Sequence, residues 1–196
     1  MLDHRENALS KERRQMDFLA LARERRSVRA YSDRNVSLED LEYCVKAAGY
    51  SPSACDSQPW RFIIVNDPRL VENISNACSG RALNINRFTR EAKAFIVIVT
   101  EKPLPAAWLG GKIKKTDFRL VDTGIACAHL TLAACSRGLG SCVIGWFDKK
   151  KVKKALNIPA GKKVPLVLAL GHPSENTCEK GKKIKEWKDL AGINSY

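Results

Sequence analysis

The sequence predicts an α+β fold in which one mixed central β-sheet is flanked by helices. Segments with helical periodicity outnumber short β-branched runs, and the two kinds alternate along the chain instead of forming separate blocks. We find no internal repeat and no linker that would divide the sequence. The 196 residues therefore predict a single domain spanning 1–196, long enough to bury a substantial core.

Three helices are expected in the first half of the chain. Residues 10–24 place apolar side chains on one side of a helix. Ser37 precedes Asp40 by three residues in a pattern close to a capping box, and Gly49 marks the end of the helix that follows. Pro68 suits the first turn of a third helix, where its missing backbone N–H is not needed.

Apolar runs predict short strands at 61–65, 95–99 and 165–170, and a short strand or turn at 141–147. The run at 95–99 reads Phe-Ile-Val-Ile-Val without interruption, which is typical of a strand buried on both faces. A polar turn at 51–60 precedes the first strand, because its Ser, Asp and Gln residues favour local hydrogen bonds over regular structure.

The second half of the chain combines a breaker-rich segment with two further helices. Two prolines, a Gly-Gly pair and Trp108 interrupt residues 103–116, which predicts a mobile loop or lid. A long helix over about 117–137 is apolar nearly all round, so we expect it to be buried on every side, at the domain centre or a subunit interface. A lysine-rich helix is expected at 149–156, followed after the last strand by a basic C-terminal arm at 173–196.

The charge of the chain is strongly positive and unevenly distributed. The formal net charge is +13, from 34 Lys and Arg against 21 Asp and Glu. Between Lys149 and Lys188, twelve lysines stand against three glutamates, so this stretch alone carries +9. Such a field attracts anions of any kind and does not choose among nucleic acid, acidic membranes and phosphorylated small molecules.

The seven cysteines are an odd number and form no C-x-x-C pair, which argues against a zinc site and a disulfide framework. A reducing cytoplasm suits such a set. The first residues lack an apolar signal core, and the longest charge-free apolar stretch, 123–136, has 14 residues, too few to span a bilayer. We therefore expect a soluble cytoplasmic protein without a membrane partner.

Hydrolytic and Rossmann-type chemistry find no support in the sequence. The three histidines, His4, His129 and His172, accompany no G-x-S-x-G, H-E-x-x-H or P-loop motif, and no G-x-G-x-x-G follows a strand. Residues 22–31, in contrast, hold four arginines and Ser27 at the end of the first helix. Guanidinium groups match phosphate oxygens two at a time, so this segment is either an anion cradle or a solvated helix end.

Four groups of residues, in order and at the expected spacing, resemble the nitroreductase family. They are Arg25-Arg26-Ser27-Val28-Arg29-Ala30-Tyr31, the turn Ser51 to Trp60, the helix segment 122–126 with its exit 138–142, and the strand segment 164–173. The resemblance covers roughly residues 15–190. Each piece is weakly specific alone, and the four in sequence are strongly specific.

The resemblance implies an intertwined homodimer that binds FMN non-covalently at the subunit interface. It assigns the phosphate and ribityl chain to Arg25, Arg26, Ser27 and Arg29, and further contacts to Pro52, Ser53 and Gln58 of the partner subunit. The polar edge of the flavin ring would contact Asn84, Asn86 or Arg87, and the ring face would contact the backbone of Val143, Ile144 and Gly145. Lys183 or Lys185 would close the phosphate site. Asp56 stands where the family usually has Asn, and a carboxylate cannot donate as an amide does.

The implied activity is hydride transfer from NADH or NADPH to a nitroaromatic, a quinone or a similar small acceptor in a ping-pong cycle. The cofactor carries this reaction, so no catalytic His or Cys is required. Arg29 is the candidate that would tune it by placing positive charge beside the pyrimidine edge of the ring.

Two alternatives remain open. Reductive dehalogenation or another specialised flavin chemistry would keep the same cofactor, and the segment 104–115 would then shape a different acceptor pocket. The lysine-rich last third could instead bind nucleic acid, although its lysines are not interleaved with aromatic residues as in a single-strand binding surface.

Overall fold

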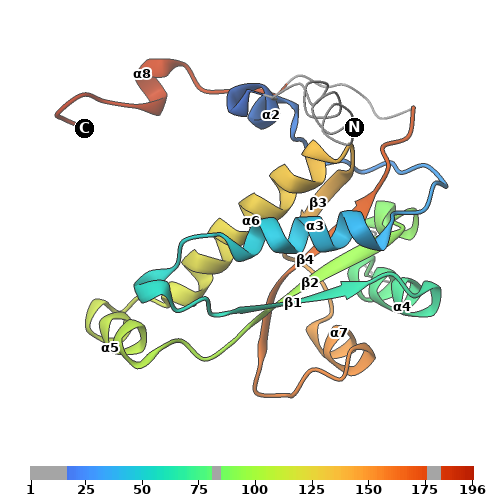
Figure 1. The fold of residues 1–196 in the computed structure, drawn as a ribbon, viewed down its shortest axis with the longest axis horizontal. Helices are drawn as coiled ribbons and strands as arrows, with labels where there is room; N and C mark the ends of the chain where they lie inside the picture. Colours follow the sequence, from blue (N-terminus) through green and yellow to red (C-terminus); the bar gives the residue numbers. More distant parts are fainter. Residues whose placement is uncertain (1–16, 81–84, 176–181) are drawn as a thin grey trace, which may run out of the picture.

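The computed structural model describes residues 17–80, 85–175 and 182–196. In these ranges four strands form one sheet in the order β1-β2-β4-β3: β1 (Trp60–Val65), β2 (Ala94–Thr100), β3 (Gly140–Ile144) and β4 (Lys163–Gly171). The helices are α2 (Phe18–Glu24), α3 (Leu38–Gly49), α4 (Pro68–Cys78), α5 (Pro105–Lys114), α6 (Phe118–Ser136), α7 (Lys149–Ala155) and α8 (Trp187–Leu190), with 3-10 turns η1 (Ala54–Asp56) and η2 (Arg87–Arg90). The α+β class is confirmed (Figure 1).

The sheet differs from the prediction in the direction of its strands. All three ladders between the named strands are antiparallel, whereas the sequence predicted a mixed sheet. The parallel pairing found in the described residues is an isolated bridge between Ser27 and Ser141. Apolar runs reveal strands but not their relative direction, because direction depends on the path of the connecting segments.

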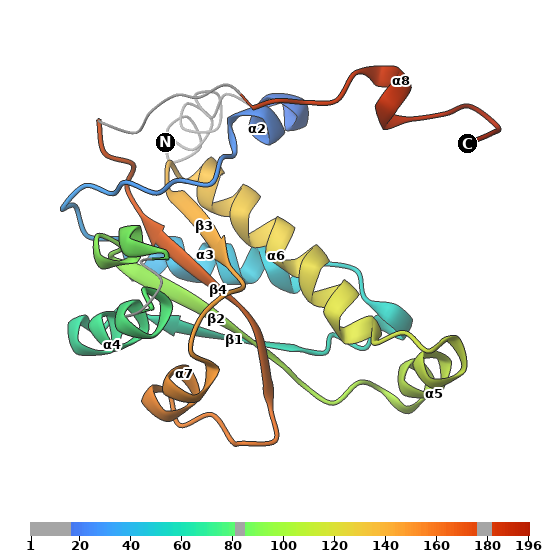
Figure 2. The same cartoon turned by 180° about the vertical axis from the view of Figure 1, so that it is seen from behind.

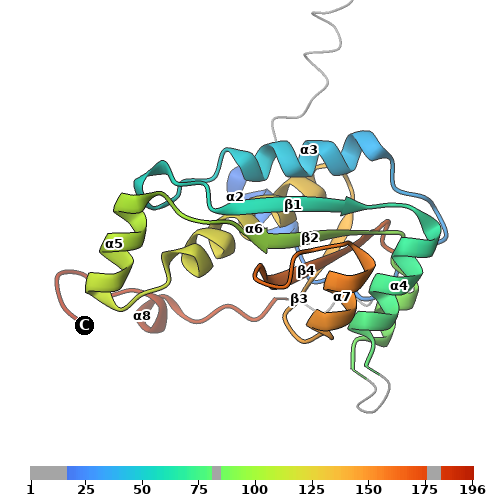
Figure 3. The ribbon, with the colours of Figure 1, turned by 90° about the horizontal axis from the view of Figure 1, so that it is seen from below.

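Helices cover both faces of the sheet, and the alternation of side chains along β2 supplies both cores. Ile96 and Ile98 pack in the cluster that includes residues of α3 and α6, whereas Val97 and Val99 pack in the cluster that includes residues of α4 and α7. Figure 3 shows α3 on one side of the sheet and α4 and α7 on the other. Every residue of β2 is buried, which confirms the prediction of a strand buried on both faces.

The helix starts follow the local capping residues. The Ser37 hydroxyl accepts a hydrogen bond from the Asp40 N–H at 3.1 Å, and α3 ends at Gly49 as predicted. Asp67 accepts from two N–H groups at the start of α4, whose first residue is Pro68. In the predicted helix at 10–24, only the part from residue 17 onward lies within the described residues, and there α2 begins at Phe18.

Residues 105–114 form helix α5, so the prediction of a mobile loop at 103–116 is wrong in its secondary structure. Pro105 occupies the first turn, where proline is tolerated. Lys115 adopts the left-handed conformation and ends the helix. A Cβ on Gly111 would lie 2.8 Å from the Thr116 carbonyl oxygen, so glycine permits this tight exit. Pro105 thus marks the start of the helix, whereas the Gly-Gly pair lies inside it.

Helix α6 matches the predicted span, but one chain buries only part of its circumference. Cys127, Leu130 and Ala134 are buried against the sheet and α3, whereas Val121 is half exposed. Among the described helices, α6 is long and apolar enough by length and composition to cross a membrane, a test that core helices also pass. The expectation of burial on every side is therefore not met within a single chain.

We predict that Tyr31→Phe lowers the free energy of unfolding by about 1–2 kcal/mol, because two buried carbonyl acceptors lose their donor. The Tyr31 hydroxyl donates to the carbonyl oxygens of Val28 at 2.9 Å and Ala169 at 3.3 Å. Urea denaturation would measure the change. Tyr50→Phe is the matched control, since Tyr50 is 89% exposed and its loss should change stability by less than about 0.5 kcal/mol. Equal effects of the two variants would contradict the prediction.

Candidate cofactor site

The arginine-rich segment runs along the ends of β3 and β4 and is hydrogen-bonded to both. The Val28 N–H donates to the Ser141 carbonyl at 3.0 Å, beside the Ser27–Ser141 bridge. Further on, the Ser174 N–H donates to the Ala30 carbonyl at 3.1 Å. The segment is therefore held in an extended conformation against the sheet.

Two glycines in the strands allow this close approach. A Cβ on Gly140 would lie 2.8 Å from the Val28 side chain, and a Cβ on Gly171 would lie 2.7 Å from the Tyr31 ring. Val28 and Tyr31 are buried, whereas Ser27 and Arg29 are exposed. The apolar residues of the segment thus anchor it while its polar residues face outward.

Arg29 and the loop that contains η2 complete one side of the site. The Arg29 guanidinium lies 5.8 Å from the centroid of the Phe88 ring. Burial raises the pKa of the Cys142 thiol in β3, and the charge of Arg29 opposes this shift. The Asn86 amide donates to the Trp146 carbonyl at 3.1 Å. Asn86 is therefore tied to the segment that leaves β3.

The exit of β3 presents backbone and one side chain to solvent. Val143 is 40% exposed and Gly145 is exposed, whereas the side chain of Ile144 is buried in the core. The prediction that the backbone around these residues faces a ligand is compatible with this arrangement. Arg87 is exposed at the start of η2, and Asn84 lies outside the described residues.

The donor set of this region fits a phosphorylated ligand. Within the described part of the chain, no ion pair involves Arg25, Arg26 or Arg29. Ser27, which lies between Arg26 and Arg29 in the sequence, is also exposed. Guanidinium groups without a carboxylate partner are free to bind phosphate in a bidentate manner. These residues fit the phosphate and ribityl chain of FMN.

The second predicted part of the site, the turn that contains η1, is tightly organised. The Gln58 N–H donates to the Ser53 hydroxyl at 2.9 Å, and the Gln58 amide donates to the Asp56 carboxylate at 3.0 Å. Cys55, Asp56 and Gln58 all have positive φ, and such strain often marks functional segments. Asp56 therefore accepts a hydrogen bond within the turn, which a carboxylate can do.

Asp122 of α6 supports this turn, and the sequence analysis assigned it no site role. Its carboxylate is 4% exposed and accepts a hydrogen bond from the Ala54 N–H at 3.1 Å. Burial raises its pKa above the ordinary range, and the Ala54 N–H partly opposes the shift. The sequence signal that could have identified Asp122 is a carboxylate within an otherwise apolar helix. A carboxylate can be buried only if it has a hydrogen-bond or charge partner.

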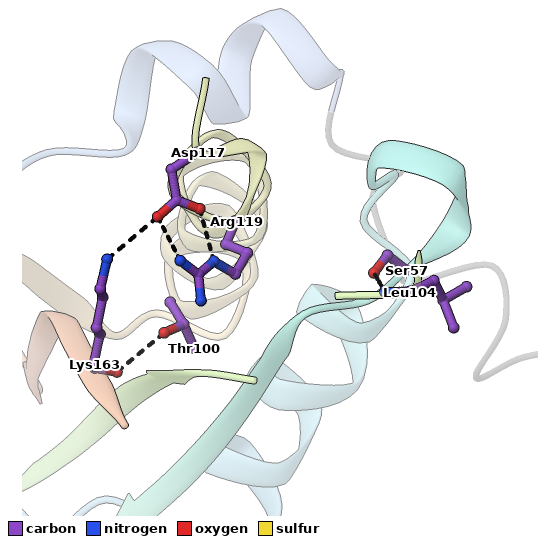
Figure 4. Close-up of polar contacts among 6 residues, drawn as sticks. All are labelled: Ser57, Thr100, Leu104, Asp117, Arg119 and Lys163. Atoms are coloured by element: carbon purple, nitrogen blue, oxygen red, sulfur yellow. Dashed lines mark hydrogen bonds and ion pairs between the residues drawn. The ribbon is translucent and has the colours of Figure 1, made fainter. Parts of the chain in front are cut away.

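The same turn also holds the start of α5. The Leu104 N–H donates to the Ser57 hydroxyl at 2.7 Å (Figure 4). Beside it, a cleft of about 450 Å³ is lined by Trp108, Phe118 and Asp122, among others. The segment 103–116 thus borders a pocket, which is where a lid would lie, and it does so as helix α5.

The two predicted parts of the site lie at opposite ends of α6 in one chain. Asp122 holds the η1 turn, whereas the charges of Glu24 and Arg25 act on the Cys135 thiol near the other end. Thirteen residues of helix separate Asp122 from Cys135, which at about 1.5 Å per residue is about 20 Å. Figure 2 shows α2 and α5 near the two ends of α6. The structure therefore does not bring the arginine segment and the 52–58 turn together within one chain.

The C-terminal arm does not close over the arginine segment in the described residues. Lys183 and Lys185 are exposed, and no hydrogen bond or ion pair joins either side chain to another described residue. Figure 1 shows α8 lying beyond α2, away from the sheet. Ile184, Trp187, Leu190 and Ile193 of the arm are also exposed. Neither side chain is hydrogen-bonded or ion-paired to the arginine segment within the described residues, and the phosphate contact of the two lysines stays a prediction.

The fold and these residues define the class of the protein. The sequence profile of the Nitroreductase family matches residues 22–172, so the chain belongs to this family of oxidoreductases. It is 34% identical over 155 residues to an Archaeoglobus fulgidus protein provisionally named NADH dehydrogenase/NAD(P)H nitroreductase, covering 77% of this chain and 82% of that protein. It is 30% identical over 175 residues to the iodotyrosine deiodinase of Thermotoga neapolitana, covering 79% and 88% of the two chains.

Solved structures show the same fold. A nitroreductase family protein from Clostridium novyi NT superposes with a TM-score of 0.71 at 28% identity, covering 82% of this chain and 87% of that chain. An FMN-dependent nitroreductase from Clostridium difficile R20291 superposes with a TM-score of 0.69 at 26% identity, covering 91% of this chain and all of that one. The recognised family and the predicted enzyme class are thereby confirmed.

We predict that Asp122→Asn stabilises the protein more at pH 7 than at pH 4. A carboxyl group whose pKa is raised by folding contributes stability that is present below its unfolded pKa and is lost as the pH rises through the folded pKa. Asparagine keeps an acceptor for the Ala54 N–H but does not titrate. The measurement is urea denaturation of both proteins across this range.

Asp117→Asn is the matched control with the opposite sign. The Arg119 guanidinium, at 2.7 Å from the Asp117 carboxylate, lowers the pKa of that carboxyl group. Wild type should therefore gain stability over Asp117→Asn as the pH rises from acid values. A pH-independent difference for Asp122→Asn would contradict the prediction.

Proposed function

We propose that the protein is an FMN-dependent oxidoreductase that passes hydride from NADH or NADPH to a nitroaromatic, a quinone or a similar small acceptor by a ping-pong mechanism. The observation that carries the proposal is the arginine segment, whose backbone is held at the ends of β3 and β4 and whose arginines form no ion pair within the described residues. The names of the A. fulgidus relative and the C. difficile structure support the same activity and cofactor.

FMN, when bound, supplies the hydride chemistry, and this chain supplies binding and electrostatics. Arg25, Arg26 and Ser27 hold the phosphate and ribityl chain. Arg29, fixed beside β3, places positive charge where negative charge develops and so favours reduction. The backbone from Val143 to Gly145 excludes water from one face of the site.

The proposed enzyme is an intertwined homodimer, because one chain separates the two parts of the site. The half-exposed apolar side of α6 and the exposed apolar residues of the C-terminal arm are suited to a second copy of the chain. A second copy would bring its 52–58 turn to the arginine segment of the first. The same arrangement gives Lys183 and Lys185 a partner subunit to reach.

A cytoplasmic location is part of the proposal. The six cysteines in the described residues are all free thiols, and four of them are buried. Free thiols persist in a reducing compartment. Soluble anionic donors such as NADH or NADPH are available there.

We predict that Arg26→Ala with Arg29→Ala lowers FMN affinity by about 100-fold, because two charge-assisted interactions are lost. The purified wild type should be yellow, and the double variant should be colourless at micromolar concentration. Arg23→Ala is the matched control, since Arg23 lies on α2 and was not assigned to the cofactor. A colourless wild type that cannot be reconstituted with FMN would overturn the proposal.

A second candidate activity is reductive dehalogenation of a halogenated phenol. The similarity to the T. neapolitana iodotyrosine deiodinase, at 30% identity over 79% of this chain, favours it. The cleft beneath α5 is where the two activities would differ. Trp108 lines this cleft and is 55% exposed, so it is available to contact an aromatic acceptor.

Turnover of a nitrobenzene, a quinone and an iodophenol under anaerobic conditions would separate the two activities. The proposed function predicts that nitro or quinone reduction exceeds deiodination by at least about tenfold in kcat/KM. Trp108→Ala should then raise the KM of aromatic acceptors and leave the rate of flavin reduction at saturating donor unchanged. Faster deiodination would replace the first candidate by the second.

A further inference from the structure

Three neighbouring clefts open where β2 ends and β4 begins. The first, of about 450 Å³, lies beneath α5. The second, of about 260 Å³, shares Arg119 with it, and the third, of about 750 Å³, shares Glu101, Pro159 and Lys162 with the second. Because each cleft shares wall residues with the next, we treat the three as one feature, the basic groove.

Positive charge predominates along the basic groove. Seven cationic side chains and three carboxylates line it, an excess of four positive charges. The cations are Arg61, Lys102, Lys112, Lys115, Arg119, Lys162 and Lys163, and the carboxylates are Glu101, Asp117 and Asp122.

The carboxylates of the groove already have partners. Asp117 binds the Arg119 guanidinium at 2.7 Å and the Lys163 ammonium at 3.4 Å (Figure 4). Glu101 is paired with Lys162. These pairs fix the walls between the clefts, and they leave the remaining cations uncompensated.

Each of the three clefts keeps a cation without a carboxylate partner. In the part of the chain that the structure describes, no ion pair involves Lys115 in the first cleft, Lys102 in the second or Arg61 in the third. Trp108 and Trp60 line the first and third clefts and offer flat surfaces. Spaced cations between aromatic rings suit a ligand with several phosphates and stacked rings.

We propose that the basic groove binds the phosphate groups of the nicotinamide dinucleotide donor. A dinucleotide carries a pyrophosphate between two nucleosides, and NADPH adds a 2′-phosphate, so its charges are spaced along its length. The groove begins at Asp122, which holds the turn assigned to the cofactor, and leads away from it. This inference rests on the proposed function, because it places the donor beside the flavin site.

The test compares two variants that lose the same charge. Lys102→Gln with Lys115→Gln removes two unpaired cations of the groove. Lys149→Gln with Lys150→Gln removes two exposed lysines of α7 that line none of the three clefts. Calorimetric titration of the FMN-loaded protein with adenosine 2′,5′-bisphosphate gives the dissociation constant.

The groove variant should bind the bisphosphate about tenfold more weakly, and the α7 variant less than twofold more weakly. The KM for NADPH should rise by a similar factor in the groove variant, while kcat at saturating donor stays unchanged. Equal weakening in both variants would overturn the inference, because it would show that the bisphosphate responds to the overall positive charge of the protein and not to the groove. Tighter binding of duplex DNA than of the bisphosphate, lost in the same variant, would overturn it too.

The proposed function and this inference fail in different ways. A wild type that holds FMN and turns over NADPH but binds no bisphosphate overturns the inference and leaves the function intact. A protein that cannot be loaded with FMN overturns the function. Titration of that protein with the bisphosphate would still decide whether the groove binds phosphates.

Discussion

The close packing of the arginine-rich segment on the ends of β3 and β4 is the contact on which the candidate site depends. Gly140 and Gly171 have no side chain, so Val28 and Tyr31 can approach the strands within van der Waals contact. A methyl group at either glycine would force the segment outward. Because Tyr31 also donates to the Ala169 carbonyl in β4, the cofactor segment and the buried core share the same residues.

Helix α6 imposes the second constraint, because it is rigid and holds the two parts of the site about 20 Å apart. At one end it supports the η1 turn through Asp122, and at the other it packs near α2. One chain therefore keeps the two predicted parts of the site apart. Apolar surface on α6 and on the C-terminal arm accompanies this incompleteness, which is why we infer that a second copy completes the site.

Much of the secondary structure could be predicted because its causes are local. Ser37 caps α3, Pro68 opens α4, and the apolar run of β2 indicated burial on both faces. Helix α5 was missed because Pro105 lies in its first turn, where proline is tolerated, and because glycine inside a helix, as at Gly110 and Gly111, costs only about 1 kcal/mol relative to alanine. The strand directions and the partial exposure of α6 depend on distant segments, so no local pattern could reveal them.

The sequence by itself indicated the chemistry available to the protein: arginines and a serine suited to an anionic cofactor, no motif of the hydrolytic or zinc-binding kinds, and a surplus of positive charge. Residue types and their order are sufficient for that inference, because charge and hydrogen-bonding capacity belong to the side chains themselves. The tertiary structure decided which groups meet. It paired Asp122 with the η1 turn, left the arginines of the cofactor segment without carboxylate partners among the described residues, and joined cations from β1, α5 and β4 in one groove. Contacts between segments far apart in the chain arise from packing. The arginine segment is anchored on the sheet by Val28 and Tyr31, which is why we propose it as the anion site.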